Sequence, residues 1–264
     1  MIHGWGMNSG VWKTVRPALE EKYTMHWIDL PGYGENSDIV ADSMENIVDL
    51  IVPNIPDNAH VVGWSLGGLI AQAIADNTHI SPPSKLKSLT LVASSPKFSQ
   101  SYDWVHAISL EILNNFSKNL KNDVDSTLKS FVALQFMGIK GSKALQKTLI
   151  DELLMNISYK TGKMRGGVLQ NTNIRTPIDA LNQTLNSGLE ILKHADYRKS
   201  SHNIPQHWIL ADRDRLIPPT VRNDLKLLRA DDQITLLENT GHAPFMTHPK
   251  EFLASLTTFV DNHS

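Results

Sequence analysis

One serine in the sequence has neighbours that suit nucleophilic catalysis. Ser65 lies in GWSLG (63–67), which fits the pattern G-x-S-x-G, at the end of the apolar run 59–64. Where this pattern joins a strand to a helix, the backbone turns so sharply that small flanking residues are needed and the serine side chain enters a cleft. The N–H of Leu66 would face the same cleft and stabilise an oxyanion. We therefore interpret Ser65 as a nucleophile; a glycine-rich turn with a capping serine is the alternative.

A serine nucleophile needs a general base and an acid that orients the base. In hydrolases with this pattern, the acid and then the histidine follow the serine along the chain. His242 lies in ENTGHAPFMTHP, in a loop before the last expected helix, so we expect it to be the base. Asp212 and Asp214 both lie near the end of the strand-like run 205–212, and either could be the acid. An early loop, HGWG at residues 3–6, would supply a second oxyanion donor from the N–H of Trp5.

The elements that must position these residues alternate between strands and helices. Strand character covers 23–32, 59–64, 87–94, 205–212 and 233–241, and helical spacing covers 43–55, 66–77 and 250–262. Such units predict a mostly parallel sheet with helices on both faces. Between about Phe98 and Leu185 only helix-like stretches occur. We expect a core formed by residues 1–97 and 186–264, and a helical lid formed by residues 98–185.

Composition restricts the kind of protein. A chain of 264 residues with 41% hydrophobic side chains can bury one large core, and its net charge of −2 gives no general attraction to nucleic acid or anionic membranes. The absence of cysteine excludes disulfides, thiolate metal sites and cysteine nucleophiles. No run is long and apolar enough to span a bilayer, and no signal peptide is recognisable. We expect a cytoplasmic monomer that binds neither nucleic acid nor membranes.

Several longer motifs point to a particular family. The chain resembles the α/β-hydrolase superfamily and, within it, the pimeloyl-[acyl-carrier protein] methyl ester esterases of biotin synthesis, through HGWGMNSGVW, DLPGYG, GWSLGG, VASSPKF, FVALQFMG, GLEILKHADYR, DRLIPP and GHAPFMTHP. FVALQFMG in the lid and GLEILKHADYR just after it are the most specific, because lids vary most between families. The resemblance implies the α/β-hydrolase fold, a catalytic triad of Ser65, Asp214 and His242, and no metal or organic cofactor.

The resemblance also implies residues that contact the substrate, namely Trp5, Leu66, Phe131, Val132, Ala133, Leu134 and Gln135. We expect Phe131 and Leu134, together with Trp64, to border an apolar channel for the acyl chain, unless they simply face the core. The implied reaction is hydrolysis of the methyl ester of pimeloyl-[acyl-carrier protein]. Two alternatives stay open: a general short-chain carboxylesterase, and a non-catalytic binding protein with the hydrolase fold.

The implied partner is an acyl carrier protein that bears the pimeloyl methyl ester. Carrier proteins of this kind are acidic, and a positive surface beside the cleft would attract one. Residues 126–175 hold only two acidic side chains, Asp151 and Glu152, but eight basic ones: Lys129, Lys140, Lys143, Lys147, Lys160, Lys163, Arg165 and Arg175.

The sequence departs from the family pattern in two places. Serines, Ser126 and Ser130, occupy two lid positions where the family has carrier-binding arginines, so we expect the lysines to take over that role. The family also has strands before the HG loop, whereas His3 here follows only two residues, so the N-terminal edge strands of the sheet are expected to be missing.

Overall fold

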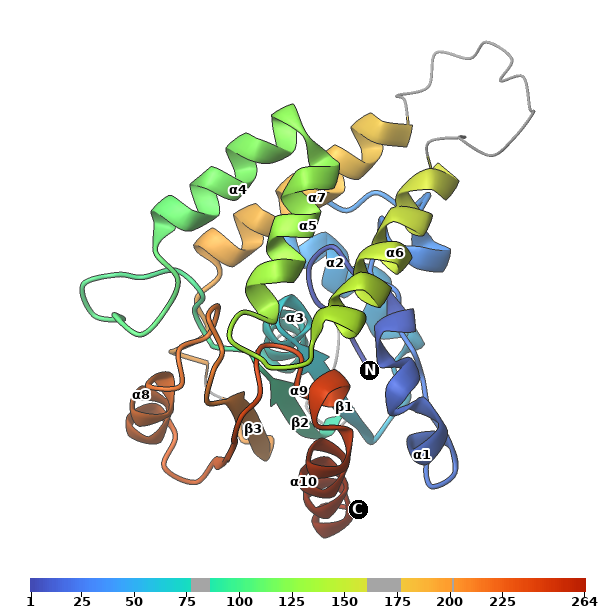
Figure 1. Cartoon of the computed structure of the whole chain (residues 1–264). Coiled ribbons are helices and arrows are strands. Elements are labelled where there is room, and N and C mark those ends of the chain that lie inside the picture. Colours follow the sequence, from blue (N-terminus) through green and yellow to red (C-terminus); the bar gives the residue numbers. More distant parts are fainter. Residues whose placement is uncertain (77–85, 161–176, 201) are drawn as a thin grey trace.

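The centre of the molecule is a four-stranded parallel sheet whose strands lie side by side in the order of the sequence (Figure 1). The computed structural model describes residues 1–76, 86–160, 177–200 and 202–264. The strands are β1 (Ala59–Trp64), β2 (Leu86–Val92), β3 (Gln206–Ala211) and β4 (Gln233–Leu237). They confirm the runs predicted at 59–64, 87–94, 205–212 and 233–241. Their carboxyl ends are in register, since Trp64 pairs with Val92 and Val92 with Ile209, so the loops that follow meet at one edge of the sheet.

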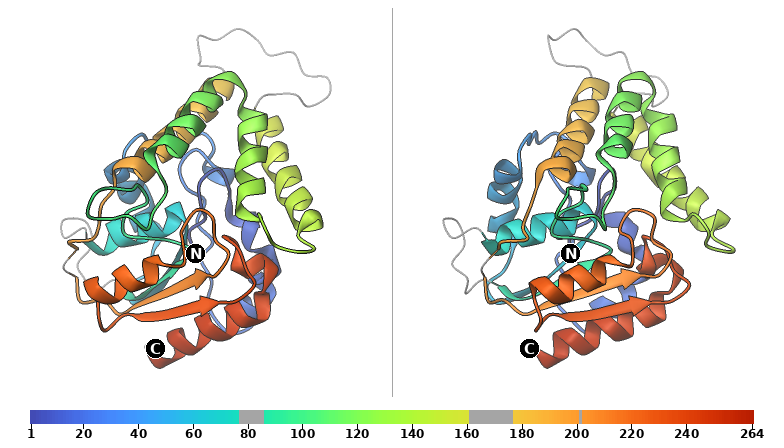
Figure 2. Two further views of the ribbon diagram at one scale, coloured as in Figure 1. Left: turned by 60° about the vertical axis from the view of Figure 1, so that its left-hand side comes forward. Right: turned by 90° about the vertical axis from the view of Figure 1, so that its left-hand side faces the viewer.

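Helices cover both faces of this sheet, as predicted (Figure 2). On one side lie α1 (Arg16–Glu20) and α10 (Pro249–Asn262), and the hydroxyl of Tyr23, three residues after α1, donates to Asp261 of α10 at 2.7 Å. On the other side lie α2 (Met44–Ile51) and α3 (Leu66–Asp76), which pack together. Short helices α8 (Val221–Leu228) and α9 (Pro244–Thr247) lie before and after β4. Three 3₁₀ helices complete the core at Ser9–Thr14, Gly34–Asn36 and Val52–Asn54.

Four further helices gather above the carboxyl ends of the strands, at the top of Figure 1. They are α4 (Leu110–Asn122), α5 (Val124–Gln135), α6 (Lys143–Lys160) and α7 (Pro177–His194). The expected lid boundary at residue 185 falls inside α7, because Leu185, Leu189 and Leu192 keep helical spacing and are buried. In the parts of the chain that the structure describes, every helix is too short or too polar to span a bilayer.

The strand expected at residues 23–32 is not formed. Only Ile28 is paired, through a single bridge to Ile2, and Ile2 also bridges to Gly63 of β1. A strand needs an extended neighbour over several residues. Among the described residues, Ile2 alone pairs on this side, and after it the chain turns into the His3 loop. The ladder beyond β1 is therefore one residue long.

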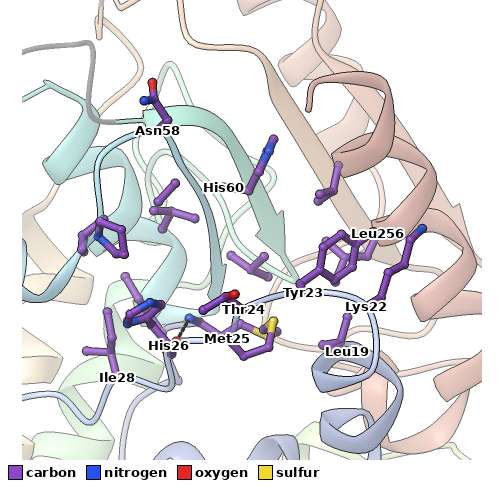
Figure 3. A pocket seen from close by; sticks show the side chains of 18 of the residues that line it. Leu19, Lys22, Tyr23, Thr24, Met25, His26, Ile28, Asn58, His60 and Leu256 are labelled. Atoms are coloured by element: carbon purple, nitrogen blue, oxygen red, sulfur yellow. Dashed lines mark hydrogen bonds between the residues drawn. The ribbon is translucent and has the colours of Figure 1, made fainter.

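An apolar groove of about 470 Å³ lies beside this bridge. Figure 3 shows Tyr23, Met25 and His26 on one bank and His60 on the other, with Leu256 from α10 at one end. Ser65, Asp214 and His242 do not line this groove, so it is separate from the candidate active site.

Candidate active site

Ser65 occupies the sharp turn that the motif predicts, directly between β1 and α3. The backbone angle φ of Ser65 is 55°, which lies in the left-handed region that residues other than glycine rarely adopt. A Cβ on Gly63 would lie 2.2 Å from the carbonyl oxygen of Gly67, and a Cβ on Gly67 would lie 2.5 Å from that of Ile2. Both glycines are therefore required by backbone packing. The turn is held by the Ser94 hydroxyl, which donates to the Ser65 carbonyl at 2.9 Å.

Three side chains from three loops meet in a hydrogen-bonded relay. The Nε2 atom of His242 lies 2.9 Å from the Ser65 hydroxyl, and its Nδ1 atom lies 2.8 Å from Oδ2 of Asp214. The other carboxylate oxygen of Asp214 accepts the N–H groups of Leu216 at 2.8 Å and Ile217 at 3.0 Å. This carboxylate favours the tautomer in which Nδ1 carries the proton, which leaves Nε2 free to accept the proton of the serine. All three catalytic candidates are buried.

The structure separates the two aspartates that sequence reasoning left open. Asp212 does not reach the histidine; its Oδ1 atom accepts the N–H of Thr240 at 3.1 Å and so joins the two loops that follow β3 and β4. Asp214, which the family resemblance favours, is the one in contact with His242.

The loop that carries His242 is fixed from two sides. The main-chain N–H of His242 donates to the carbonyl of Gln135, at the end of α5, at 3.1 Å. The carbonyl of His242 accepts the indole N–H of Trp64 at 2.7 Å. Trp64 is 1% exposed and packs against Trp12 and Phe245, with ring centroids 6.4 and 5.1 Å away. The structure therefore places Trp64 in the aromatic core that supports the His242 loop, instead of on the channel border where we expected it.

The HGWG loop lies against the nucleophile and presents a free N–H. His3 braces this loop: its Nδ1 atom bonds the Gly4 carbonyl at 2.8 Å, and its Nε2 atom accepts the N–H of Leu30 at 3.0 Å. Burial lowers the pKa of His3 to about 4, so the ring stays neutral near pH 7. Within the described chain, the N–H groups of Trp5 and Leu66 have no hydrogen-bond acceptor. Two donors are thus free to bind an oxyanion.

The lid residues implied as substrate contacts do not share one surface. Phe131 is buried with its ring edge-to-face to Trp5, at 4.7 Å between centroids, while Ala133 is exposed and Leu134 is half-buried. Val132 is fully buried. Gln135 is buried too, and neither its amide nitrogen nor its amide oxygen has a partner among the described residues. An unpaired buried amide is costly, so the side chain of Gln135 keeps an unused donor and an unused acceptor.

Sequence reasoning missed the supporting role of three residues, Ser94, Gln135 and Gly188. The hydroxyl of Ser94 and the carbonyl of Gln135 form hydrogen bonds with main-chain groups of Ser65 and His242, and no sequence motif predicts these bonds. Gly188 lies in the middle of α7, where a Cβ would meet the Trp5 ring at 2.6 Å. An isolated glycine within a helical pattern usually has a packing reason, so Gly188 could have been recognised from the sequence.

Comparison with known proteins defines the class of protein to which this site belongs. The model of the alpha/beta hydrolase family matches residues 1–255. An esterase from Exiguobacterium antarcticum has a TM-score of 0.79 at 19% identity, with 99% of this chain and 90% of that chain aligned. A hydrolase from Oleispira antarctica has a TM-score of 0.78 at 19% identity, with 99% and 89% aligned. These structures support the fold, and the chain belongs to the alpha/beta hydrolase family.

More similar relatives are curated as a particular kind of esterase. The pimeloyl-[acyl-carrier protein] methyl ester esterase of Photobacterium profundum is 34% identical over 262 residues, which cover 98% of this chain and 93% of that protein. The protein of the same name from Pseudoalteromonas atlantica is 32% identical over 266 residues, with 97% and 91% covered.

Proposed function

We propose that this protein is a serine carboxylesterase that hydrolyses the methyl ester of pimeloyl-[acyl-carrier protein], releasing methanol and a free carboxylate for biotin synthesis. The observation that carries the proposal is the relay from Asp214 through His242 to Ser65, formed in a chain whose relatives carry this name over nearly their full length.

The first half of the reaction forms an acyl-enzyme. Nε2 of His242 accepts the Ser65 proton as the hydroxyl oxygen attacks the ester carbonyl, and the negative charge that develops on the carbonyl oxygen is met by the free N–H groups of Trp5 and Leu66. The imidazolium then donates its proton to the methoxy oxygen, and methanol leaves. Asp214 stays ionised and stabilises the imidazolium.

The second half releases the product. A water molecule replaces methanol, His242 removes its proton, and the resulting hydroxide attacks the Ser65 ester. The tetrahedral intermediate collapses with the proton returning to the Ser65 oxygen. The product is a pimeloyl chain with one free carboxyl group, still attached to its carrier at the other end.

The residues proposed to contact the acyl chain come from the lid. The lid comprises residues 98–185 and the remainder of α7. Phe131 and Leu134 provide apolar surface, and Gln135 provides the unpaired amide described above. Trp5 and Leu66 contact the reacting ester through their main-chain N–H groups. Residues 1–97 and the chain after α7 form the hydrolase core.

The proposed docking surface for the carrier is the lysine-rich part of the lid. Lys140 and Lys143 are exposed beside the turn between α5 and α6, without an ion pair among the described side chains. Lys147 is partly neutralised by Asp151, 3.0 Å away. Ser126 and Ser130 are exposed on α5. Of the eight basic residues counted in the sequence, Lys163, Arg165 and Arg175 lie outside the described residues.

The experiment that tests this proposal measures kcat/KM of the purified protein for three ester substrates. They are the carrier-bound pimeloyl methyl ester, the same acyl chain on free pantetheine, and a phenyl acetate. We expect the carrier-bound ester to be the best substrate, with its advantage over the pantetheine ester shrinking as salt rises. Equal or greater kcat/KM for phenyl acetate would indicate a general carboxylesterase, and no turnover of any ester would indicate a non-catalytic binding protein.

A further inference from the structure

The side chain of Trp5 points away from the reacting atoms and into the lid. Its indole N–H donates to the Leu185 carbonyl of α7 at 2.8 Å, and the residue is only 1% exposed. Its ring meets Phe131 of α5 edge-to-face at 4.7 Å and lies 6.5 Å from the ring of Phe116 in α4. Three lid helices therefore hold the side chain of the residue whose main-chain N–H is a proposed oxyanion donor.

The position of Gly188 in α7 makes this contact close. A Cβ on Gly188 would lie 2.6 Å from Cδ1 and 3.0 Å from Nε1 of the Trp5 indole, and 3.5 Å from a methyl group of Leu66. The side chains of both proposed donors thus meet the helix at the same residue. Because only a glycine leaves room there, α7 and the indole fit together in one arrangement.

The main chain around Trp5 is held by the core, because the Met7 N–H donates to the Gly4 carbonyl at 3.2 Å and a Cβ on Gly4 would lie 3.1 Å from the Trp64 ring. His3 fixes the start of the loop, through Gly4 and Leu30. Beyond it, Gly6 adopts a φ of 74° and faces Leu128 of the lid, whose methyl group would lie 3.2 Å from a Cβ there. The Trp5 side chain, in contrast, is held by contacts with the lid.

We propose that the side chain of Trp5 positions its own main-chain N–H and so couples the lid to the oxyanion hole, with Gly188 as the residue of α7 against which the indole packs. The proposal rests on the proposed esterase function and deepens it: the second oxyanion donor is in place only while α7 is packed on the core. Displacing the indole from its place beside Gly188 should therefore reduce kcat.

Two variants test the coupling from opposite sides. Trp5→Phe removes the indole N–H and keeps an aromatic ring, whereas Gly188→Ala leaves Trp5 unchanged and displaces its ring. Each has a matched control: Trp104→Phe removes another buried indole N–H, which donates to Lys97 at 2.9 Å, and Ser187→Ala changes the neighbouring position of α7. If Trp5→Phe fails to fold, Gly188→Ala carries the test alone.

The readout is hydrolysis of phenyl acetate, whose short acyl group does not need the lid as a pocket, together with binding of a trifluoromethyl ketone that mimics the oxyanion. Loss of one oxyanion donor costs about 100- to 1,000-fold in kcat, so displacing one predicts a loss of about 10- to 100-fold. We expect that loss in kcat with little change in KM, an equal loss of inhibitor affinity, and no change in either control.

Unchanged kcat for phenyl acetate in folded variants, with a raised KM only for long acyl esters, would overturn the proposal and make Trp5 a pocket wall. Equal losses in the controls would overturn it too. Failure of the proposed function is distinguishable, because it would show as Ser65→Ala retaining the wild-type rate.

Discussion

Replacing Asp214 by asparagine is the sharpest test of how the acid works. The Oδ1 atom of Asp214 accepts two backbone N–H groups, from Leu216 and Ile217. Only an oxygen can accept these bonds, so the introduced amide keeps its oxygen there and turns its NH₂ group toward Nδ1 of His242, where Oδ2 now lies 2.8 Å away. Because NH₂ donates, Nδ1 must become the acceptor, and the ring proton moves to Nε2.

The consequence is a histidine that can no longer act as a base. Nε2, 2.9 Å from the Ser65 oxygen, would point a proton at the hydroxyl instead of a lone pair. In serine hydrolases this change of tautomer costs about 10⁴-fold in kcat, or about 5.5 kcal/mol. The protein should still fold, since the shape and the two backbone bonds are kept.

The matched control is Asp212→Asn. Asp212 accepts one N–H, from Thr240, and an amide oxygen can accept it equally well, so we expect kcat within about threefold of wild type. The assay is steady-state hydrolysis of a phenyl ester, with circular dichroism as a check on folding. Equal losses at the two positions, or more than a tenth of the wild-type activity in Asp214→Asn, would refute this reasoning.

Three further predictions follow from the lid and from buried groups. Phe131→Ala should raise KM for long acyl esters more than for acetyl esters if Phe131 lines the acyl channel; a uniform loss of folded protein would instead show that it belongs to the core. Reversing Lys140 and Lys143 to glutamate should lower kcat/KM on the carrier-bound ester about 10-fold at low salt, whereas Lys226→Glu on α8 should change it little; a response that ignores salt would contradict the proposed docking surface. The folded-state pKa of His3, about 4, is depressed from 6.5, so the unfolded chain binds a proton between these pH values and the folded chain does not. The stability present above pH 6.5 should therefore fall by about 3 kcal/mol toward pH 4, and urea unfolding of His3→Gln should show a shallower pH dependence; an equal slope in both proteins would contradict this.

Much of the core could be predicted from the sequence because its patterns are local. The strand-to-helix turn at Ser65 depends on Gly63 and Gly67, which are visible in five residues. The prediction of a strand at 23–32 was wrong because a strand also needs a neighbouring strand. The run has residues typical of strands, but among the described residues Ile2 alone pairs with it.

The site depends more on contacts between distant residues. From the residues alone Asp212 and Asp214 were equivalent, and only the fold shows that one reaches His242 while the other holds Thr240. Trp64 reads as a channel residue beside the nucleophile, yet its ring packs into the core because Trp12 and Phe245 come to it from far along the chain. The lid contacts of Trp5 were likewise beyond prediction, since they join residues far apart in the chain, 180 positions in the case of Leu185.

The central claim is that Ser65 attacks the methyl ester of a carrier-bound pimeloyl chain, and trapping the acyl-enzyme tests it most directly. The protein is mixed with the carrier-bound ester, quenched in acid within one turnover, and analysed by mass spectrometry. Attack on the methyl ester releases methanol and leaves the carrier joined covalently to Ser65 through the pimeloyl chain. We expect this conjugate with the wild-type protein, and its absence with Ser65→Ala. Release of the carrier thiol, with a pimeloyl monomethyl ester left on Ser65, would show attack on the thioester instead and contradict the account.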